Sequence, residues 1–265
     1  MDKPFSSLEK AIDILSYFYS ENQAFSAQEI SGHLSIPLST TYKYLDVLLK
    51  KGFLSKDPDT KKVFLGLTIF KMGNLVAAKI KPIEVALRHM NDLANLSGET
   101  VTLTIIHGWE SLCVEKIESP RRIKLSVAMG DTLPLHAGGS SKVLLAYQDD
   151  AFIDAMIKNV GLVALTENTI TDPVRLKKEL KLIRSQGSAY SDSEVDYGAR
   201  AAAAPVFDSR GRLAAGIAVA GPRDRINDET AQNLIKSVKE SAGKISSDLG
   251  YIPQTNYKRK SSDKI

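Results

Sequence analysis

Cysteine is almost absent from this 265-residue chain, which contains only Cys113. A single cysteine forms neither an intrachain disulfide nor a thiolate cage for zinc, and such scarcity is typical of a reducing compartment. The four histidines, at positions 33, 89, 107 and 136, do not have the spacing of a metal site. We therefore interpret Cys113 as a small buried apolar side chain, and we expect no metal ion and no cofactor.

Long apolar runs are also missing. No window approaches the roughly 18 uninterrupted apolar residues of a membrane-spanning helix, and the opening residues lack the pattern of a secretion signal. Hydrophobic residues make up 43% of the chain and charged residues 25%, which is ordinary for a globular protein with two cores. We expect a cytoplasmic protein with no membrane partner.

Familiar catalytic motifs are absent too, including the nucleophile elbow, the Walker loop and the dinucleotide fingerprint. An enzyme would have to use Cys113, His107, His136 or the serines at positions 140 and 141, which form no nucleophile–base pattern. We interpret His136 as a hydrogen-bonded structural residue. The sequence therefore does not predict an enzyme, and a defined reaction product would overturn that expectation.

Positive charge is unevenly distributed. The net charge is only +4, but residues 38–79 contain eight lysines and three acids, a net charge of +5. Charge alone favours a solvated lysine-rich face. Whether this segment binds DNA therefore has to be judged from its pattern of helices and strands.

Two helical patterns open the chain. Ser6 and Glu9 have the spacing of a capping box, and apolar residues then recur at helical spacing over residues 7–20. Ser26 and Glu29 have the same spacing before a shorter helix, which a proline interrupts.

A third helix is predicted between Leu38 and the stop signal at Gly52. Its buried face is expected to hold Leu38, Tyr42, Leu45, Leu48 and Leu49. The opposite face is expected to hold Thr40, Thr41, Lys43, Tyr44 and Val47. Hydroxyls, a lysine, an aromatic ring and a small apolar group can contact phosphates, base edges and thymine methyls, so this face predicts a recognition helix.

Two short strand patterns follow, at residues 53–56 and 61–65, joined by turn residues. Three helices and a hairpin in this order are typical of a winged helix-turn-helix, and lysines on the hairpin suit the phosphate backbone. We predict DNA contacts from Ser39, Thr40, Thr41, Lys43, Tyr44, Lys50, Lys61 and Lys62. The alternative is a module that docks proteins without touching DNA, and it would lack the steep salt dependence of phosphate contacts.

Four segments are expected along the chain: a DNA-binding domain at 5–66, a linker helix at 67–80, a larger domain at 81–251 and a disordered basic tail at 252–265. The linker helix is unusually apolar, which is explained either by burial against another subunit or by packing within its own chain. Strand patterns lie at residues 101–106, 112–117, 123–127, 201–207 and 213–220. Helical patterns between and after them predict an α+β sandwich-like sensor.

Three landmarks resemble the IclR-type family of regulators, and the resemblance covers about residues 5–250. They are residues 39–54, residues 134–146, and residues 190–206 with Gly198, Arg200 and Pro205. The resemblance implies a GAF-like effector-binding fold for the larger domain, and a homodimer or dimer of dimers on a palindromic DNA operator. It also implies a transcription regulator, more often a repressor of a catabolic operon than an activator. The sequence sets neither the effector, nor the operator, nor the sign of regulation.

The loop at residues 135–141 combines glycines, which let backbone amides approach a ligand, with serines that cap the next helix. Such amides favour an anion such as a carboxylate, and a turn that only caps a helix is the alternative. The resemblance places a small-molecule effector against Gly139 and Ser140, with a second wall at Ser191, Asp192, Ala201, Ala203 and Ala218.

Two features of the second wall have their own interpretation. Relatives often have a cysteine or a larger apolar residue at the Ala201 position, so the alanine of this chain is expected to leave room for a bulkier effector. The alternative is that a differently positioned backbone closes the same space. Asp192 either binds a polar group of the ligand or is a solvated loop charge. The effector is expected to bias one of two arrangements of the sensor domains, which the linker helix transmits to the recognition helices.

Overall fold

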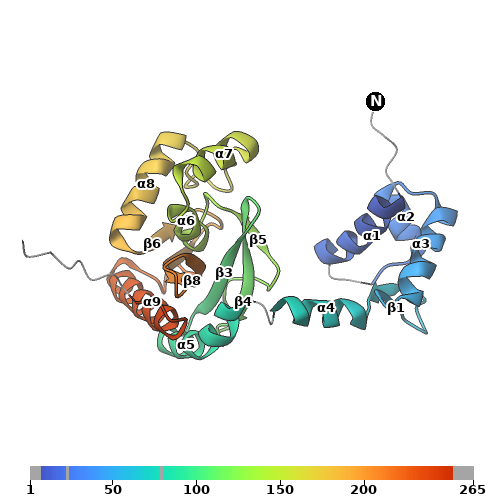
Figure 1. Cartoon of the computed structure of the whole chain (residues 1–265), viewed down its shortest axis with the longest axis horizontal. Coiled ribbons are helices and arrows are strands. Elements are labelled where there is room, and N and C mark those ends of the chain that lie inside the picture. The colour runs from blue at the N-terminus through green and yellow to red at the C-terminus, as the bar shows by residue number, and fades with distance from the viewer. Residues whose placement is uncertain (1–6, 22–23, 78–79, 253–265) are drawn as a thin grey trace, which may run out of the picture. The chain divides into compact units, whose positions relative to one another are not determined.

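The computed structural model of the chain describes residues 7–21, 24–77 and 80–252. It divides into two compact units, Met1–Ile80 and Lys81–Ile265, which we describe one at a time (Figure 1). No helix among the described residues is both long and apolar enough to cross a membrane. Ser6 of the first predicted capping box and residues 253–265 of the predicted tail lie outside the described residues.

The first unit has three helices, a hairpin and a fourth helix: α1 (Ser7–Glu21), α2 (Ala27–Leu34), α3 (Leu38–Lys50), β1 (Leu54–Lys56), β2 (Val63–Leu65) and α4 (Leu67–Ala77). An apolar core joins α1, α2, α3 and the hairpin, with Ile14, Ile30, Leu45 and Leu54 all at most 4% exposed. The two strands pair antiparallel, as a wing requires. The predicted winged helix-turn-helix is confirmed.

The N-termini of α2 and α3 are capped differently. Ser26 and Glu29 form the predicted capping box: the Ser26 amide donates to Glu29 Oε2 at 2.6 Å and the Glu29 amide donates to Ser26 Oγ at 3.2 Å. α3 begins after Pro37, which provides no side-chain cap. Its first turn therefore presents backbone amides at the positive end of the helix dipole.

The second unit is built on a six-stranded antiparallel sheet in the order β5-β4-β3-β8-β7-β6. Its strands are β3 (Thr100–His107), β4 (Glu110–Ile117), β5 (Thr132–Pro134), β6 (Ala189–Asp192), β7 (Ala199–Phe207) and β8 (Leu213–Pro222). Its helices are α5 (Lys81–Ser97), α6 (Gly139–Ala146), α7 (Asp150–Val160), α8 (Pro173–Gln186) and α9 (Asp228–Asp248). α5 and α9 cover one face, and α6, backed by α7 and α8, covers the other (Figure 1). The predicted α+β fold of the larger domain is confirmed.

Strand alternation divides the alanine run of β7 between these two faces. Ala202 and Ala204 pack in the core under α5 and α9, whereas Ala203 packs in the core under α6. Ala218 of β8 lies opposite Ala203 and joins it beneath α6. Small side chains on a continuous ladder let both helical layers approach the sheet closely.

The strand expected at residues 123–127 does not form, and two other strands were missed. Ile123 is 74% exposed, so this apolar-looking stretch finds no sheet face to pack against. β5 is three residues long and ends in a proline at the sheet edge, and β6 has little of the β-branched content that marks strands. Both are ordered by pairing with β4 and β7 rather than by their own propensity.

Candidate nucleic-acid interface and ligand site

The burial of α3 corrects the predicted faces of this helix. Thr41 is fully buried, and its hydroxyl lies 3.3 Å from the carbonyl oxygen of Pro37, so its expected position on the DNA face is wrong. Leu38 and Tyr42, both expected in the core, are instead 38% and 51% exposed. The buried positions are Thr41, Leu45 and Leu48, spaced four and three residues apart, whereas Leu49 is half-buried.

The exposed face of α3 carries polar and apolar groups side by side. Ser39, Lys43 and Lys50 are exposed, as is Val47 at 54%, whereas Thr40 and Tyr44 are half-buried. Lys50 forms an ion pair with Asp46 one turn earlier, with Nζ and Oδ2 2.7 Å apart. Lys43 has no ion pair with a described residue, so it is the lysine of this helix most available to a phosphate.

The hairpin loop is shaped by Asp57, which folds back on the turn that follows it. Its Oδ1 accepts from the Thr60 amide at 2.6 Å and from the Thr60 hydroxyl at 2.8 Å, and these bonds hold the pKa of the Asp57 carboxyl below its usual value. Lys61 adopts a left-handed backbone conformation and is exposed. Lys62 is half-buried and its Nζ lies 3.4 Å from Glu29 Oε1. The Lys61 ammonium donates to the carbonyl oxygen of Pro58 at 2.5 Å, so each of these two lysines already has a partner within the described residues.

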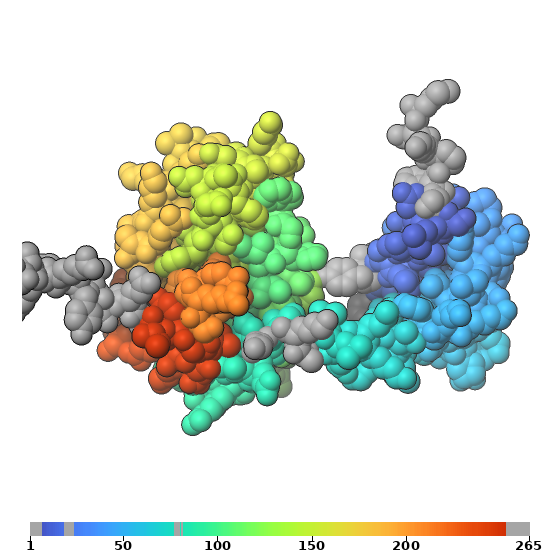
Figure 2. Space-filling model, viewed as in Figure 1, coloured from blue at the N-terminus to red at the C-terminus, as the bar shows by residue number. Residues whose placement is uncertain are grey.

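The linker helix α4 exposes a large apolar surface. Leu67, Phe70, Leu75 and Val76 are each at least 60% exposed. The helix lies in the teal part of the space-filling view (Figure 2). Two apolar residues of α1 are also exposed, Leu8 at 70% and Ile12 at 52%. Within the described residues of this unit, nothing covers these side chains, which removes packing inside the same unit as an explanation for the apolar helix.

The glycine-rich loop before α6 is held by side chains from the β6 end of the sheet. The Gly139 amide donates to Ser191 Oγ at 3.0 Å, and the Gly138 amide donates to Glu194 Oε2 at 3.0 Å. A Cβ at Gly139 would stand 3.3 Å from the carbonyl oxygen of Ala201. The structure therefore brings Gly139, Ser191 and the Ala201 backbone together, and their role as an effector site stays a prediction.

A buried lysine lies directly beneath this loop. Lys142 of α6 is 1% exposed, and its Nζ lies 2.5 Å from Glu194 Oε1 and 3.2 Å from Glu179 Oε1 on α8. Because the other oxygen of Glu194 accepts the Gly138 amide, one carboxylate joins the loop to the helix. This Lys142 network was missed from sequence, since a lysine inside an apolar helix looks like a solvated charge.

Four of the remaining predicted wall residues lie on the α6 side of the sheet, and Asp192 lies on the other side. Ser140 and Ala201 are half-buried near Gly139, while Ala203 and Ala218 are buried in the core under α6. Asp192 follows Ser191 in β6, so its side chain points to the other face. There it pairs with Arg200, at 2.8 Å between Oδ2 and Nη2, which holds its pKa below the usual value. The structure does not bring Asp192 to the loop, and its ligand role stays a prediction.

Three of the side chains weighed as catalytic candidates, His136, Ser141 and Cys113, are buried in the structure. His136 is 1% exposed and its Nε2 lies 2.9 Å from the carbonyl oxygen of Val163. Ser141 Oγ lies 2.7 Å from Ser111 Oγ. Cys113 is buried, and burial raises the pKa of its thiol to about 11. Among the described residues, no three His, Cys, Asp or Glu side chains are grouped to hold a metal ion.

Comparison with known proteins matches both units. The model of the IclR helix-turn-helix domain matches residues 7–58, and that of the bacterial transcriptional regulator IclR C-terminal domain matches residues 75–247. The HTH-type transcriptional repressor AllR of Salmonella typhimurium is 32% identical over 95% of this chain and 92% of its own length. The AllR repressor of Escherichia coli K12 is 31% identical over 94% of this chain and 92% of its own length.

Solved structures have the same fold. The IclR of Thermotoga maritima has a TM-score of 0.78 and 31% identity, over 92% of this chain and 99% of its own. An IclR homologue from Microbacterium hydrocarbonoxydans, complexed with 4-hydroxybenzoate, has a TM-score of 0.83 and 23% identity, over 92% and 99%. With both units matched in order, and curated relatives above 30% identity over nearly the whole length, the chain belongs to the IclR family of bacterial transcriptional regulators.

Proposed function

We propose that the chain is a repressor that binds a palindromic operator as a homodimer or dimer of dimers, under the control of a small carboxylate. It acts in the cytoplasm by binding rather than by catalysis. Residues 5–66 bind DNA, residues 81–251 bind the effector, and the helix at residues 67–80 links these two domains. The repressor name of the AllR relatives supports this sign of regulation, and an activator with the same DNA contacts is the alternative.

The observation that carries the proposal is the exposed face of α3 beside its uncapped N-terminus. In the major groove, Ser39 and the first-turn amides would contact a phosphate, while Lys43 and Tyr42 would reach base edges or the backbone. Thr40 and Tyr44 have partial exposure for the same task, and Lys50, Lys61 and Lys62 would lie along the flanking phosphates.

Effector binding is proposed at the loop around Gly139 and Ser140. The Gly139 amide already donates to Ser191 Oγ, so a carboxylate would exchange with this hydroxyl and Ser191 would turn to the ligand. The 4-hydroxybenzoate held by the Microbacterium homologue is itself a carboxylate, which supports this ligand class. Ala201 beside the loop leaves room for a larger body, and a bound-ligand structure with Ala201 remote from the ligand would exclude that part.

The test of DNA binding is selection of duplexes from a random pool by the full-length protein, followed by fluorescence anisotropy at fixed salt. We expect an inverted repeat bound with nanomolar affinity. Failure to enrich any duplex would favour the protein-docking alternative. A promoter fusion carrying the selected site then distinguishes repression from activation, and a carboxylate that shifts melting without shifting operator affinity would contradict effector control.

The dimer is proposed to form through the exposed apolar residues of α4, with Leu8 and Ile12 of α1 contributing. One recognition helix with few cationic contacts binds DNA weakly, so pairing two of them is part of the DNA-binding proposal. Apolar side chains this exposed are typical of a surface that another subunit covers.

A further inference from the structure

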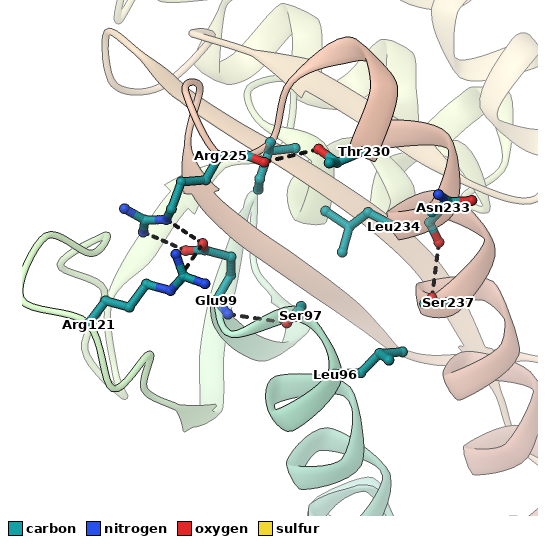
Figure 3. A pocket seen from close by; sticks show the side chains of 10 residues that line it. Leu96, Ser97, Glu99, Arg121, Arg225, Thr230, Asn233, Leu234 and Ser237 are labelled. Carbon is teal, nitrogen blue, oxygen red and sulfur yellow. Dashed lines mark hydrogen bonds and ion pairs between the residues drawn. The ribbon is translucent and has the colours of Figure 1, made fainter.

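A cavity of about 500 Å³ opens in the second unit between the end of α5 and the first half of α9 (Figure 3). It lies on the sheet face that α5 and α9 cover, whereas the Gly139 loop begins α6 on the opposite face. Its size is within the range of pockets that bind small molecules. The site proposed for the effector therefore does not account for this cavity.

A charged cluster forms one wall. Glu99 has a side chain only 5% exposed, and Arg225 binds it through two contacts, Nε to Oε1 at 2.5 Å and Nη2 to Oε2 at 2.7 Å. Arg121 approaches the same carboxylate more loosely, with Nε 4.0 Å from Oε1, and its side chain is 51% exposed. Two guanidinium groups face one carboxylate, so the side chains of Glu99, Arg121 and Arg225 together carry a net charge of +1 (Figure 3).

Two glycines leave room for this cluster. A Cβ at Gly221 would stand 2.5 Å from Glu99 Oε2, and a Cβ at Gly98 would stand 3.0 Å from Arg121 Nη2. Larger residues at either position would displace the carboxylate or the guanidinium. The local backbone therefore accommodates the charged groups where they are.

The opposite wall is mixed in character. Leu96, 72% exposed at the end of α5, and Leu234 of α9 provide apolar surface. The hydroxyls of Ser97, Thr230 and Ser237 already donate to backbone carbonyl oxygens. Among the described residues, the side-chain amide of Asn233 and the guanidinium of Arg121 make no hydrogen bond, and both are therefore donors available to a ligand.

We propose that this cavity is a second ligand site, which binds a small monocarboxylate with an apolar body. The carboxylate lies against Arg121, whose planar fork matches two oxygens, and the body lies over Leu96 and Leu234. A single excess positive charge favours one carboxylate over a multiply charged anion. The apolar wall favours a ring or chain over acetate or inorganic phosphate.

The test uses benzoate as the probe, with benzamide as its neutral analogue and acetate as the carboxylate without an apolar body. Equilibrium dialysis of the full-length protein should show benzoate bound at least about tenfold more tightly than either, as expected for a charge-assisted pair combined with apolar contact. Arg121→Gln and Leu96→Glu should each weaken benzoate binding about tenfold or more. Arg122→Gln, a change of the exposed neighbouring arginine, should leave it unchanged.

A crystal of the full-length protein grown with 4-iodobenzoate locates the site directly through the anomalous signal of iodine. An iodine peak between Leu96 and Leu234, lost in Arg121→Gln crystals, supports the proposal. A peak only near Gly139, benzamide bound as tightly as benzoate, or no binding at millimolar benzoate would each overturn it. None of these measurements involves DNA, so their failure is distinguishable from failure of the proposed regulatory function.

Discussion

At the scale of single residues, Lys142 shows how a charge inside the second unit is made tolerable. Removing the ammonium in Lys142→Met would leave Glu194 buried without its cation, so we expect unfolding to cost about 3 kcal/mol less. Urea unfolding followed by the fluorescence of Trp109 measures this, because the only tryptophan of the chain packs against the core under α6.

The double variant Lys142→Met/Glu194→Gln distinguishes a charge effect from a packing effect. Glutamine keeps an oxygen for the Gly138 amide without a charge, so the double variant should recover part of the lost stability. Lys158→Met, on the exposed part of α7, should change stability by less than about 0.5 kcal/mol. A double variant less stable than Lys142→Met would contradict the uncompensated-charge explanation.

Cys113 provides a second prediction about a single residue, and here sequence and structure agree. With the thiol pKa raised to about 11 by burial, roughly a thousandth of Cys113 is thiolate at pH 8, about a hundredfold less than for an ordinary thiol. Reaction with an aromatic disulfide reagent should therefore be at least roughly a hundredfold slower in the native protein than in guanidinium chloride. Equal rates would mean that the thiol is accessible.

At the scale of elements, α3 and the wing predict an order among the lysines. Lys43→Ala should lower operator affinity and reduce the slope of log K against log salt by about 0.9, the value for one phosphate contact. Lys50→Ala and Lys62→Ala should have smaller effects, because Asp46 and Glu29 already neutralise part of these charges. Fluorescence anisotropy over a salt series measures both quantities.

The control for this series is Lys158→Ala on α7, which should leave the slope and the affinity unchanged. An unchanged slope in Lys43→Ala together with lower affinity would indicate that Lys43 reads a base or supports the fold rather than contacting a phosphate. Lys62→Ala with the largest effect would mean that the Glu29 ion pair opens when DNA binds.

The elements also show what sequence can predict. The Ser26–Glu29 capping box, Pro37 and the helical periodicity placed α2 and α3 correctly, and the turn residues between two strand patterns placed the hairpin, because these signals are local. Periodicity failed within α3, where Thr41 was exchanged with Tyr42, since hydroxyl and ring are each compatible with either face until packing decides. Likewise β6 was missed because its order comes from pairing with β7, and the Lys142 network because its acids lie 37 and 52 residues away.

At the scale of the whole molecule, the proposed DNA binding depends on assembly. Leu75→Asp places a charge in the exposed apolar surface of α4, which a partner subunit would have to bury, so the variant should dissociate. Sedimentation analysis should give about twice or four times the 28.9 kDa chain mass for the unmodified protein and a lower mass for the variant. Operator affinity should fall with the mass, because one recognition helix is then left to bind alone.

Two comparisons make this prediction specific to α4. Leu182→Asp changes an equally large, 48% exposed leucine on α8 and should keep both mass and operator affinity. Lys43→Ala should keep the mass while losing affinity, which separates contact with DNA from assembly. If Leu75→Asp retained the mass and the affinity of the unmodified protein, the subunits would have to associate elsewhere, and the exposed apolar face of α4 would need a different partner.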